Sequence, residues 1–257
     1  MPVPTPPDDA PGVALTEGHL LGGRVRYAQP RHGFRSGIEP VLLAASLPAE
    51  PGQRVLEGGS GAGATLLCLA ARVAGVTAVG IEQDAGLVEL ARYNVQANGW
   101  TGLAFVTATI EAPVSLGLFD HACANPPYHL AAGTSSPERS RRAAKQGGVG
   151  LLAVWAVALA AHLRPHGTLT FILPAARMPD GLAAFAAAGC RPAALLPFWP
   201  REETPAKLVL LRGIKDRQGP FQVLPGLVLH APGKGFTPEA EAILRDGASL
   251  VMRATGP

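Results

Sequence analysis

Residues 53–63 read Gln-Arg-Val-Leu-Glu-Gly-Gly-Ser-Gly-Ala-Gly, and this stretch decides the fold. Residues 53–57 have the apolar character of a buried strand, and three alternating glycines follow at once. The apolar run over residues 64–73 then has the composition of a helix. A strand, a glycine loop and a helix in this order bring the backbone close to a nucleotide-like ligand. The sequence therefore predicts a ligand pocket at Glu57, Gly59, Gly61 and Gly63.

An acidic residue closes the next predicted strand. Residues 77–82 read Thr-Ala-Val-Gly-Ile-Glu, so Glu82 is expected at the carboxyl end of that strand. It comes about twenty residues after Gly59, which is the separation expected of an acid that binds ribose hydroxyls. The alternation of Gly59, Gly61 and Gly63 departs from the dinucleotide fingerprint, in which the last glycine comes one residue later. The loop and the acid together indicate a nucleoside-containing ligand.

Strand and helix patterns alternate along the chain. Further strands are predicted at 103–107, 119–124 and 168–173, and helices at 62–73, 84–98, 148–163 and 178–188. Such alternation favours an α/β fold, in which a Rossmann-like parallel sheet carries helices on both faces. A chain of 257 residues with 47% hydrophobic content can bury one large core. We expect a proline-rich disordered tip at 1–14 and a single domain at 15–257, in which residues 15–46 cap the ligand pocket.

A second motif, Asn125-Pro126-Pro127-Tyr128, follows the predicted strand at 119–124. Two prolines fix the backbone and remove two N–H donors, which leaves the Asn125 side-chain oxygen and the Pro126 carbonyl as acceptors. Tyr128 adds a flat aromatic face. This set suits a planar substrate with an NH2 group, because two acceptors can hold the two amino hydrogens while the ring stacks. We therefore expect the four residues to be catalytic.

In this order, the glycine loop, Glu82 and the Asn-Pro-Pro-Tyr motif resemble the class I S-adenosylmethionine-dependent methyltransferases that modify amino groups. The narrower resemblance is to bacterial tRNA (adenine-N6)-methyltransferases that act on the adenine next to the anticodon of a valine tRNA. Residues 29–44, the arginine-rich stretch after Tyr128, and the tail segments 226–230 and 236–240 carry it. The resemblance covers about residues 20–250.

The resemblance implies a seven-stranded sheet that ends in an antiparallel hairpin, near residues 191–198 and 207–212. It implies S-adenosylmethionine as cofactor and adenine N6 in tRNA as the methylated position. Carried over residue by residue, the cofactor would be bound by Glu57, Gly59, Gly61, Gly63, Glu82, Thr109 and Asn125.

Three positions depart from the family pattern. Glu57 stands where the family usually has Asp, and Gly58 stands where it has a large apolar residue, so we expect a looser loop. Thr109 stands in for an acid that binds the adenine amino group, and its hydroxyl can accept a hydrogen bond without the charge. These departures leave open a protein whose cofactor site has decayed.

A basic stretch, Pro-Glu-Arg-Ser-Arg-Arg-Ala-Ala-Lys at 137–145, follows the Asn-Pro-Pro-Tyr motif. Beside a catalytic loop, such a stretch can contact phosphates of RNA, and elsewhere it is a solvated surface loop. The candidate RNA-binding residues are Arg139, Arg141, Arg142 and Lys145. The net charge of +3 permits contact with nucleic acid without requiring it.

Three cysteines, Cys68, Cys123 and Cys190, lie inside apolar runs and read as core residues, so we expect neither a disulfide framework nor a metal site. The longest membrane-like run, residues 151–163, is too short to cross a bilayer. No charged and then apolar leader opens the chain. We expect a cytoplasmic protein without membrane contact that is a monomer.

Two rival functions remain open. Asn-Pro-Pro-Tyr also serves methyltransferases that act on a glutamine side-chain amide in release factors or on cytosine N4, since both present a planar NH2. The glutamine enzymes carry a helical N-terminal domain, and the short proline-rich start of this sequence argues against that reading. The other rival is a non-catalytic RNA- or nucleoside-binding protein.

Overall fold

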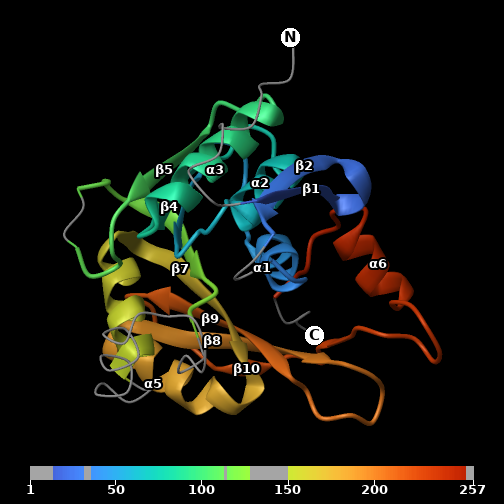
Figure 1. Ribbon diagram of the computed structural model, residues 1–257. Helices are drawn as coiled ribbons and strands as arrows, with labels where there is room; N and C mark the ends of the chain where they lie inside the picture. Colours follow the sequence, from blue (N-terminus) through green and yellow to red (C-terminus); the bar gives the residue numbers. More distant parts are fainter. Residues whose placement is uncertain (1–13, 32–35, 113–114, 128–149, 253–257) are drawn as a thin grey trace, which may run out of the picture.

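The computed structural model describes residues 14–31, 36–112, 115–127 and 150–252 (Figure 1). Their main feature is a nine-stranded sheet in the order β10-β8-β9-β7-β6-β3-β4-β5, with β11 paired to β8. Every pairing in it is parallel except those of β9 with β7 and β8. The strands are β3 (Arg54–Gly58), β4 (Thr77–Glu82), β5 (Leu103–Thr107), β6 (Phe119–Ala124), β7 (Leu163–Pro174), β8 (Cys190–Trp199), β9 (Leu208–Lys215), β10 (Gln222–Val223) and β11 (Leu227–Val228).

The expected seven-stranded sheet and its antiparallel hairpin are confirmed as β5-β4-β3-β6-β7-β9-β8. Two short strands enlarge it, because β10 and β11 both pair with β8. Each has only two residues, which is too few to show a periodic pattern.

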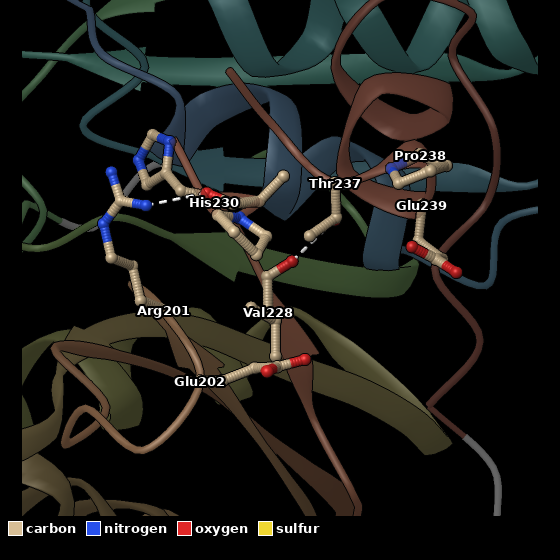
Figure 2. A pocket seen from close by; sticks show the side chains of 9 residues that line it. Arg201, Glu202, Val228, His230, Thr237, Pro238 and Glu239 are labelled. Atoms are coloured by element: carbon tan, nitrogen blue, oxygen red, sulfur yellow. Dashed lines mark hydrogen bonds between the residues drawn. The ribbon is translucent and has the colours of Figure 1, made fainter. Parts of the chain in front are cut away.

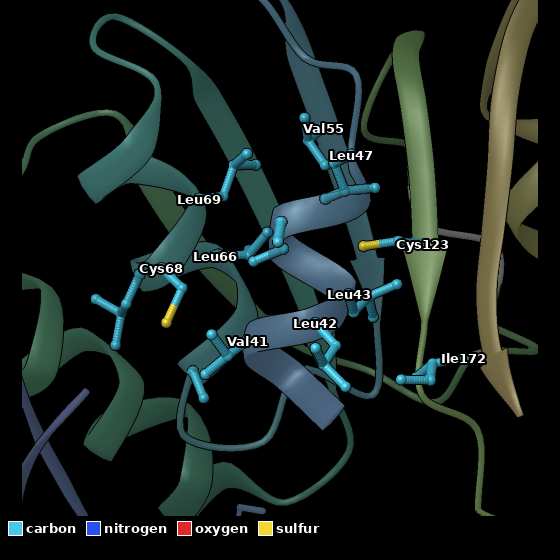
Figure 3. Packing of buried hydrophobic residues seen from close by; sticks show 14 of the residues in the cluster. Val41, Leu42, Leu43, Leu47, Val55, Leu66, Cys68, Leu69, Cys123 and Ile172 are labelled. Carbon is cyan, nitrogen blue, oxygen red and sulfur yellow. The ribbon is translucent and has the colours of Figure 1, made fainter. Parts of the chain in front are cut away.

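Helices cover both faces of the sheet, as predicted. One face packs against α1 (Glu39–Ser46), α2 (Ala64–Arg72) and α3 (Ala85–Ala97). The other packs against a helix described over residues 150–161 and against α5 (Met178–Ala187). Neighbouring residues of β3 point to opposite faces: Val55 belongs to the first cluster and Leu56 to the second. Figure 3 shows α1 lying among side chains of α2 and the sheet, with Leu42 and Leu43 fully buried.

The predicted strand at 168–173 is longer in the structure, since β7 begins at Leu163. Arg164-Pro165-His166-Gly167 has the composition of a turn, and His166 adopts a positive φ of 64°. The register against β6 shifts between Phe119 and His121, so this stretch forms an irregularity inside the strand and does not end it.

The segment before β3 contains an antiparallel hairpin of β1 (Leu15–Leu20) and β2 (Val25–Pro30), joined by the short 3-10 helix η1 (Leu21–Gly23). The hairpin lies beside α2 and α3, and α6 (Pro238–Leu244) lies near it and α1 (Figure 1). A second 3-10 helix, η2 (Ala175–Arg177), follows β7. The division into a tip, a cap and one domain stays a prediction, and residues 1–13 of the tip lie outside the described residues.

Candidate functional site

Three predicted site segments meet at the carboxyl edge of the sheet. Gly58 of β3 pairs with Ile81 of β4 on one side and with Ala124 of β6 on the other. The next residue along each strand is Gly59, Glu82 and Asn125, respectively. The register therefore brings the glycine loop, the acid and the start of the Asn-Pro-Pro-Tyr motif to one level. In an open α/β sheet, ligands bind at this edge.

The glycine loop is tied to the neighbouring strand by backbone hydrogen bonds. Gly59 N and Ser60 N both donate to the Ile81 carbonyl, at 2.8 and 3.1 Å. The three alternating glycines have φ values of 66°, 53° and 89°, which other residues rarely adopt, at Gly59, Gly61 and Gly63. This conformation explains why the loop needs glycine at each of the three positions.

Glu82 holds the loop through its side chain. Its Oε2 accepts from Gly61 N and its Oε1 from Asp84 N, both at 3.0 Å. A carboxylate has about four acceptor sites, so these two bonds leave capacity for further donors. The side chain is buried, with 9% exposure. Glu82 is thus fixed in place with acceptor sites left over, as a residue that binds a diol requires.

Glu57 is the most unusual group of the site. It is 3% exposed, and its Oε2 has no hydrogen-bond partner among the described residues. Burial raises the pKa of this carboxyl to about 8, a hydrogen bond from Thr65 lowers it in part, and the charge of Glu82 raises it further. A cationic donor placed at Oε2 would satisfy this oxygen and favour the ionised form.

Gly58 does not lie in the loop. It belongs to β3, with ladder partners on both sides, so the expected loosening at this position is wrong. A Cβ at Gly58 would lie 2.9 Å from the Ile110 side chain and 3.3 Å from that of Leu159. A Cβ at Gly59 would lie 2.6 Å from the Trp155 ring. The space of the missing side chains is therefore filled by Ile110, Leu159 and Trp155.

The remaining predicted residues are only partly described. Asn125 is half-buried, Pro126 is buried and Pro127 is exposed at the end of β6. Thr109 is exposed, in a loop whose Ala108 N donates to the Glu82 carbonyl at 2.9 Å. Outside the described residues lie Tyr128, Arg139, Arg141, Arg142 and Lys145.

The sequence patterns did not indicate a further polar group beside Glu57. Tyr27 of β2 is buried, and its hydroxyl is 2.8 Å from Ser36 Oγ. Burial raises the pKa of Tyr27 to about 12, the bond with Ser36 lowers it in part, and the charge of Glu57 raises it. Tyr27 lies just before the stretch 29–44 that carried the resemblance, and Ser36 lies inside it. A single sequence does not reveal that these two side chains are in contact.

A separate pocket of about 360 Å³ lies at the C-terminal part of the sheet (Figure 2). Arg201 donates to the carbonyls of Ala231 and Gly233, and His230 stacks on Phe236 with ring centroids 4.8 Å apart. Glu202 and Glu239 also line it. None of the residues predicted to bind cofactor lines this pocket, and its mixed charges favour no ligand class.

Two absences hold for the described parts of the chain. No helix there is both long and apolar enough to span a membrane. No group of three or more histidine, cysteine or acidic side chains is arranged there to hold a metal ion. The three cysteines are buried and unpaired, as predicted for core residues.

The fold is that of the class I S-adenosylmethionine-dependent methyltransferases, since a putative enzyme of this class from Listeria monocytogenes superposes with a TM-score of 0.53 at 18% identity, over 75% of this chain and 63% of that one. A solved structure with a similar fold is that of a predicted O-methyltransferase from Agrobacterium tumefaciens. It superposes with a TM-score of 0.69 at 22% identity, over 84% of this chain and all of that one. The family model of the methyltransferase small domain matches residues 39–147. The recognition as a methyltransferase of this class is therefore confirmed, and the cofactor that fold and family imply is S-adenosylmethionine.

Within this class, the chain is similar to RNA-modifying enzymes. It is 29% identical over 166 residues to a tRNA1(Val) (adenine(37)-N6)-methyltransferase from Tolumonas auensis, covering 63% of this chain and 68% of that enzyme. It is 36% identical over 127 residues to a 23S rRNA (uracil(1939)-C(5))-methyltransferase from Alkalilimnicola ehrlichii. That match covers 42% of this chain, which spans only 28% of the length of the rRNA enzyme.

The residues present fit the cofactor. Among the described residues, no group donates to the buried Glu57 Oε2, and two backbone amides donate to Glu82, which leaves it further acceptor sites at the same edge. A Cβ at Gly61 would meet no atom of the described residues within 4 Å, so none of them closes off the backbone there from a ligand. A ligand with a cationic amine and a diol matches these groups.

The carboxyl of Glu57 predicts a pH-dependent stability. Its pKa rises from 4.5 to about 8 on folding, because the folded state favours the protonated carboxyl. The stabilisation that this group gives to the folded state is therefore fully present below pH 4.5 and is lost as the pH rises to 8. His121 acts in the opposite sense at lower pH, because burial lowers its pKa from 6.5 to about 4. Between pH 6.5 and 8, the free energy of unfolding should therefore fall by up to about 1.4 kcal/mol per pH unit.

Urea unfolding of the cofactor-free protein across this range measures the slope. The matched variant is Glu57→Gln, which keeps the shape of the side chain and cannot ionise. Its free energy of unfolding should be nearly flat over the same range. An unchanged slope in Glu57→Gln would show that another group titrates.

Proposed function

We propose that this protein is an active N-methyltransferase that transfers a methyl group to the exocyclic N6 of an adenine in tRNA. The observation that carries the proposal is the common level of Gly59, Glu82 and Asn125 at the carboxyl edge of the sheet. The similarity to enzymes named as tRNA adenine-N6-methyltransferases supports the choice of substrate.

The cofactor would be held by the residues of two neighbouring strands. We assign the ribose hydroxyls to Glu82, which is already fixed by Gly61 N and Asp84 N. We assign the amino group of the methionine part to Glu57, because no group in the described parts of the chain donates to its Oε2. Thr109 is assigned to the adenine side on its place after β5, and its exposure leaves it accessible there.

S-adenosylmethionine, when bound, supplies a methyl group that is activated by a positively charged sulfur. The Asn125 side-chain oxygen and the Pro126 carbonyl would accept the two hydrogens of the adenine amino group and aim its nitrogen lone pair at the cofactor pocket. Such orientation can contribute roughly 7–11 kcal/mol in favourable cases. The amine becomes acidic once a new N–C bond forms, so its proton can leave to water without a strong base.

The target adenine has to leave its stack to reach Asn125. We propose that Tyr128 stacks on it and that Arg139, Arg141, Arg142 and Lys145 contact phosphates. These residues lie outside the described parts, so their roles rest on the sequence. The proposal also keeps the expectation of a cytoplasmic monomer.

Methylation of uracil at C5, the reaction in the name of the rRNA relative, is disfavoured by the cysteines. That chemistry needs a nucleophile that adds to C6 and makes C5 electron-rich, a role suited to a reactive thiolate. All three cysteines are buried, and burial raises the thiol pKa to about 12 in Cys68 and about 11 in Cys190, and well above 9 in Cys123.

The proposal is tested by incubation with labelled S-adenosylmethionine and two separate substrate pools, total tRNA and purified release factors. Mass spectrometry of the digested products should find the label as N6-methyladenosine. Label on a protein glutamine would replace the proposal with the glutamine enzyme. A thermal-shift titration with the cofactor accompanies it, since a ligand that binds the native state must raise its stability. The absence of both label and thermal shift would favour a decayed cofactor site.

A further inference from the structure

Two asparagines at the C-terminal end of α3, Asn94 inside the helix and Asn98 directly after it, bind the backbone of β2 in the same way. Asn94 Oδ1 accepts from Ala28 N at 2.8 Å, and its Nδ2 donates to the Ala28 carbonyl at 2.9 Å. Asn98 Oδ1 accepts from Arg26 N at 2.9 Å, and its Nδ2 donates to the Arg26 carbonyl at 2.8 Å. Each side-chain amide thus pairs with one residue of β2 as a neighbouring strand would. Together they attach the N-terminal hairpin to the methyltransferase core.

Only Asn94 also reaches the glycine loop. Its Nδ2 donates a second hydrogen bond to the Ala62 carbonyl at 3.0 Å. Ala62 lies between Gly61 and Gly63, and Gly61 N is held by Glu82. The second bond of Asn98 Nδ2 reaches only α3, to the Asn94 carbonyl at 2.7 Å. Asn94 is 1% exposed, so the loss of its bonds would leave buried carbonyls without a partner.

The hairpin carries further polar contacts next to Ala28. Tyr27, next to Ala28 in β2, binds Ser36, and Ser36 N donates to Gln29 Oε1 at 3.1 Å. Tyr27 is buried, with 5% exposure. β2 and the glycine loop lie side by side against α3. Asn94 bonds to both.

We propose that Asn94 is a positioning residue of the cofactor pocket, which couples the place of the N-terminal hairpin to the conformation of the glycine loop. Asn98 fastens the hairpin without this coupling. The expected effect of Asn94 on cofactor binding rests on the proposed function, because it assumes that S-adenosylmethionine binds at this loop. The coupling itself does not.

The first arm of the test needs no cofactor. Hydrogen–deuterium exchange follows the loop amides in the wild type, in Asn94→Ala and in the matched control Asn98→Ala. Four of these amides are hydrogen-bonded, so local opening of the loop controls their exchange: Gly59, Ser60, Gly61 and Gly63. In Asn94→Ala, exchange at Gly61 and Gly63 should rise at least tenfold, whereas in Asn98→Ala it should stay within twofold. Equal effects of the two variants would overturn the coupling.

The second arm measures cofactor affinity by calorimetry and the KM for the cofactor. Asn94→Ala should raise the dissociation constant of the cofactor and its KM at least tenfold, with kcat within about threefold. Asn98→Ala should change neither by more than twofold. If Asn94→Ala does not fold, Asn94→Ser replaces it with the same expectations. A wild type without cofactor affinity would contradict the proposed function, while the exchange arm still decides the coupling. Unchanged affinity in a folded Asn94 variant, beside a normal wild type, would overturn the positioning role.

Discussion

Replacing Asn125 by alanine is expected to lower kcat at least a hundredfold and to leave the dissociation constant of S-adenosylmethionine within about threefold. Asn125 directly follows the residue of β6 that pairs with Gly58, so it stands at the carboxyl edge of the sheet, level with the glycine loop. It is proposed to act on the target amine. Removal of one preorganised hydrogen-bonding group at a reacting centre costs roughly 10²–10³ in rate in other enzymes.

The measurement combines single-turnover methyl transfer to total tRNA with calorimetric titration of the cofactor. The informative companion is Asn125→Asp, which keeps an acceptor oxygen and should retain more activity than Asn125→Ala. Turnover close to the wild type in Asn125→Ala would remove Asn125 from the chemistry. A large loss of cofactor affinity would instead place it among the groups that anchor the cofactor.

The class of fold could be predicted from the sequence because its signals are local. The stretch at 53–72 contains a strand, a positive-φ loop and a helix, and each leaves a composition that is visible in one sequence. The predicted strands at 77–82, 103–107 and 119–124 match β4, β5 and β6 residue for residue. The order of β8 and β9 came from the resemblance and not from periodicity.

The walls of the site could not be predicted in the same way. Ile110 and Trp155 fill the space beside Gly58 and Gly59, although they are far apart along the chain. The three bonds of Asn94 join segments 32 and 66 residues away. A buried asparagine on a helix looks like any polar residue of that helix until the packing is known. Contacts of this kind depend on the tertiary structure alone.

Gly58 shows how a local rule can mislead. In isolation, a glycine before a glycine loop indicates extra freedom. In the structure, its backbone is held in a ladder between β4 and β6, and its missing side chain makes room for Ile110 and Leu159. A bulky residue at this position would require these two side chains to move. The departure from the family pattern at Gly58 is therefore matched by its neighbours and does not by itself argue for a decayed site.

Replacing Glu82 by alanine is expected to raise the dissociation constant of the cofactor about a hundredfold. A hydrogen bond to a charged group contributes roughly 1.5–3 kcal/mol, and Glu82 is proposed to accept two from the ribose. Part of the loss would come from the loop, because Gly61 N and Asp84 N would lose their acceptors. The matched control is Glu89→Ala, which removes the same charge from an exposed site on α3, where Glu89 pairs with Arg92.

Calorimetry with S-adenosylmethionine measures the effect, and thermal unfolding of the cofactor-free variants separates loop damage from lost contacts. Glu82→Gln keeps one acceptor, so its affinity should fall between those of Glu82→Ala and the wild type. Unchanged affinity in Glu82→Ala would remove this residue from the site. Glu82→Ala should lower cofactor affinity, and Asn125→Ala should lower turnover. The two positions nevertheless lie at one level of the sheet, on either side of Gly59. If both variants failed in the same parameter, the proposed separation of cofactor binding at β4 from amine orientation at β6 would be wrong.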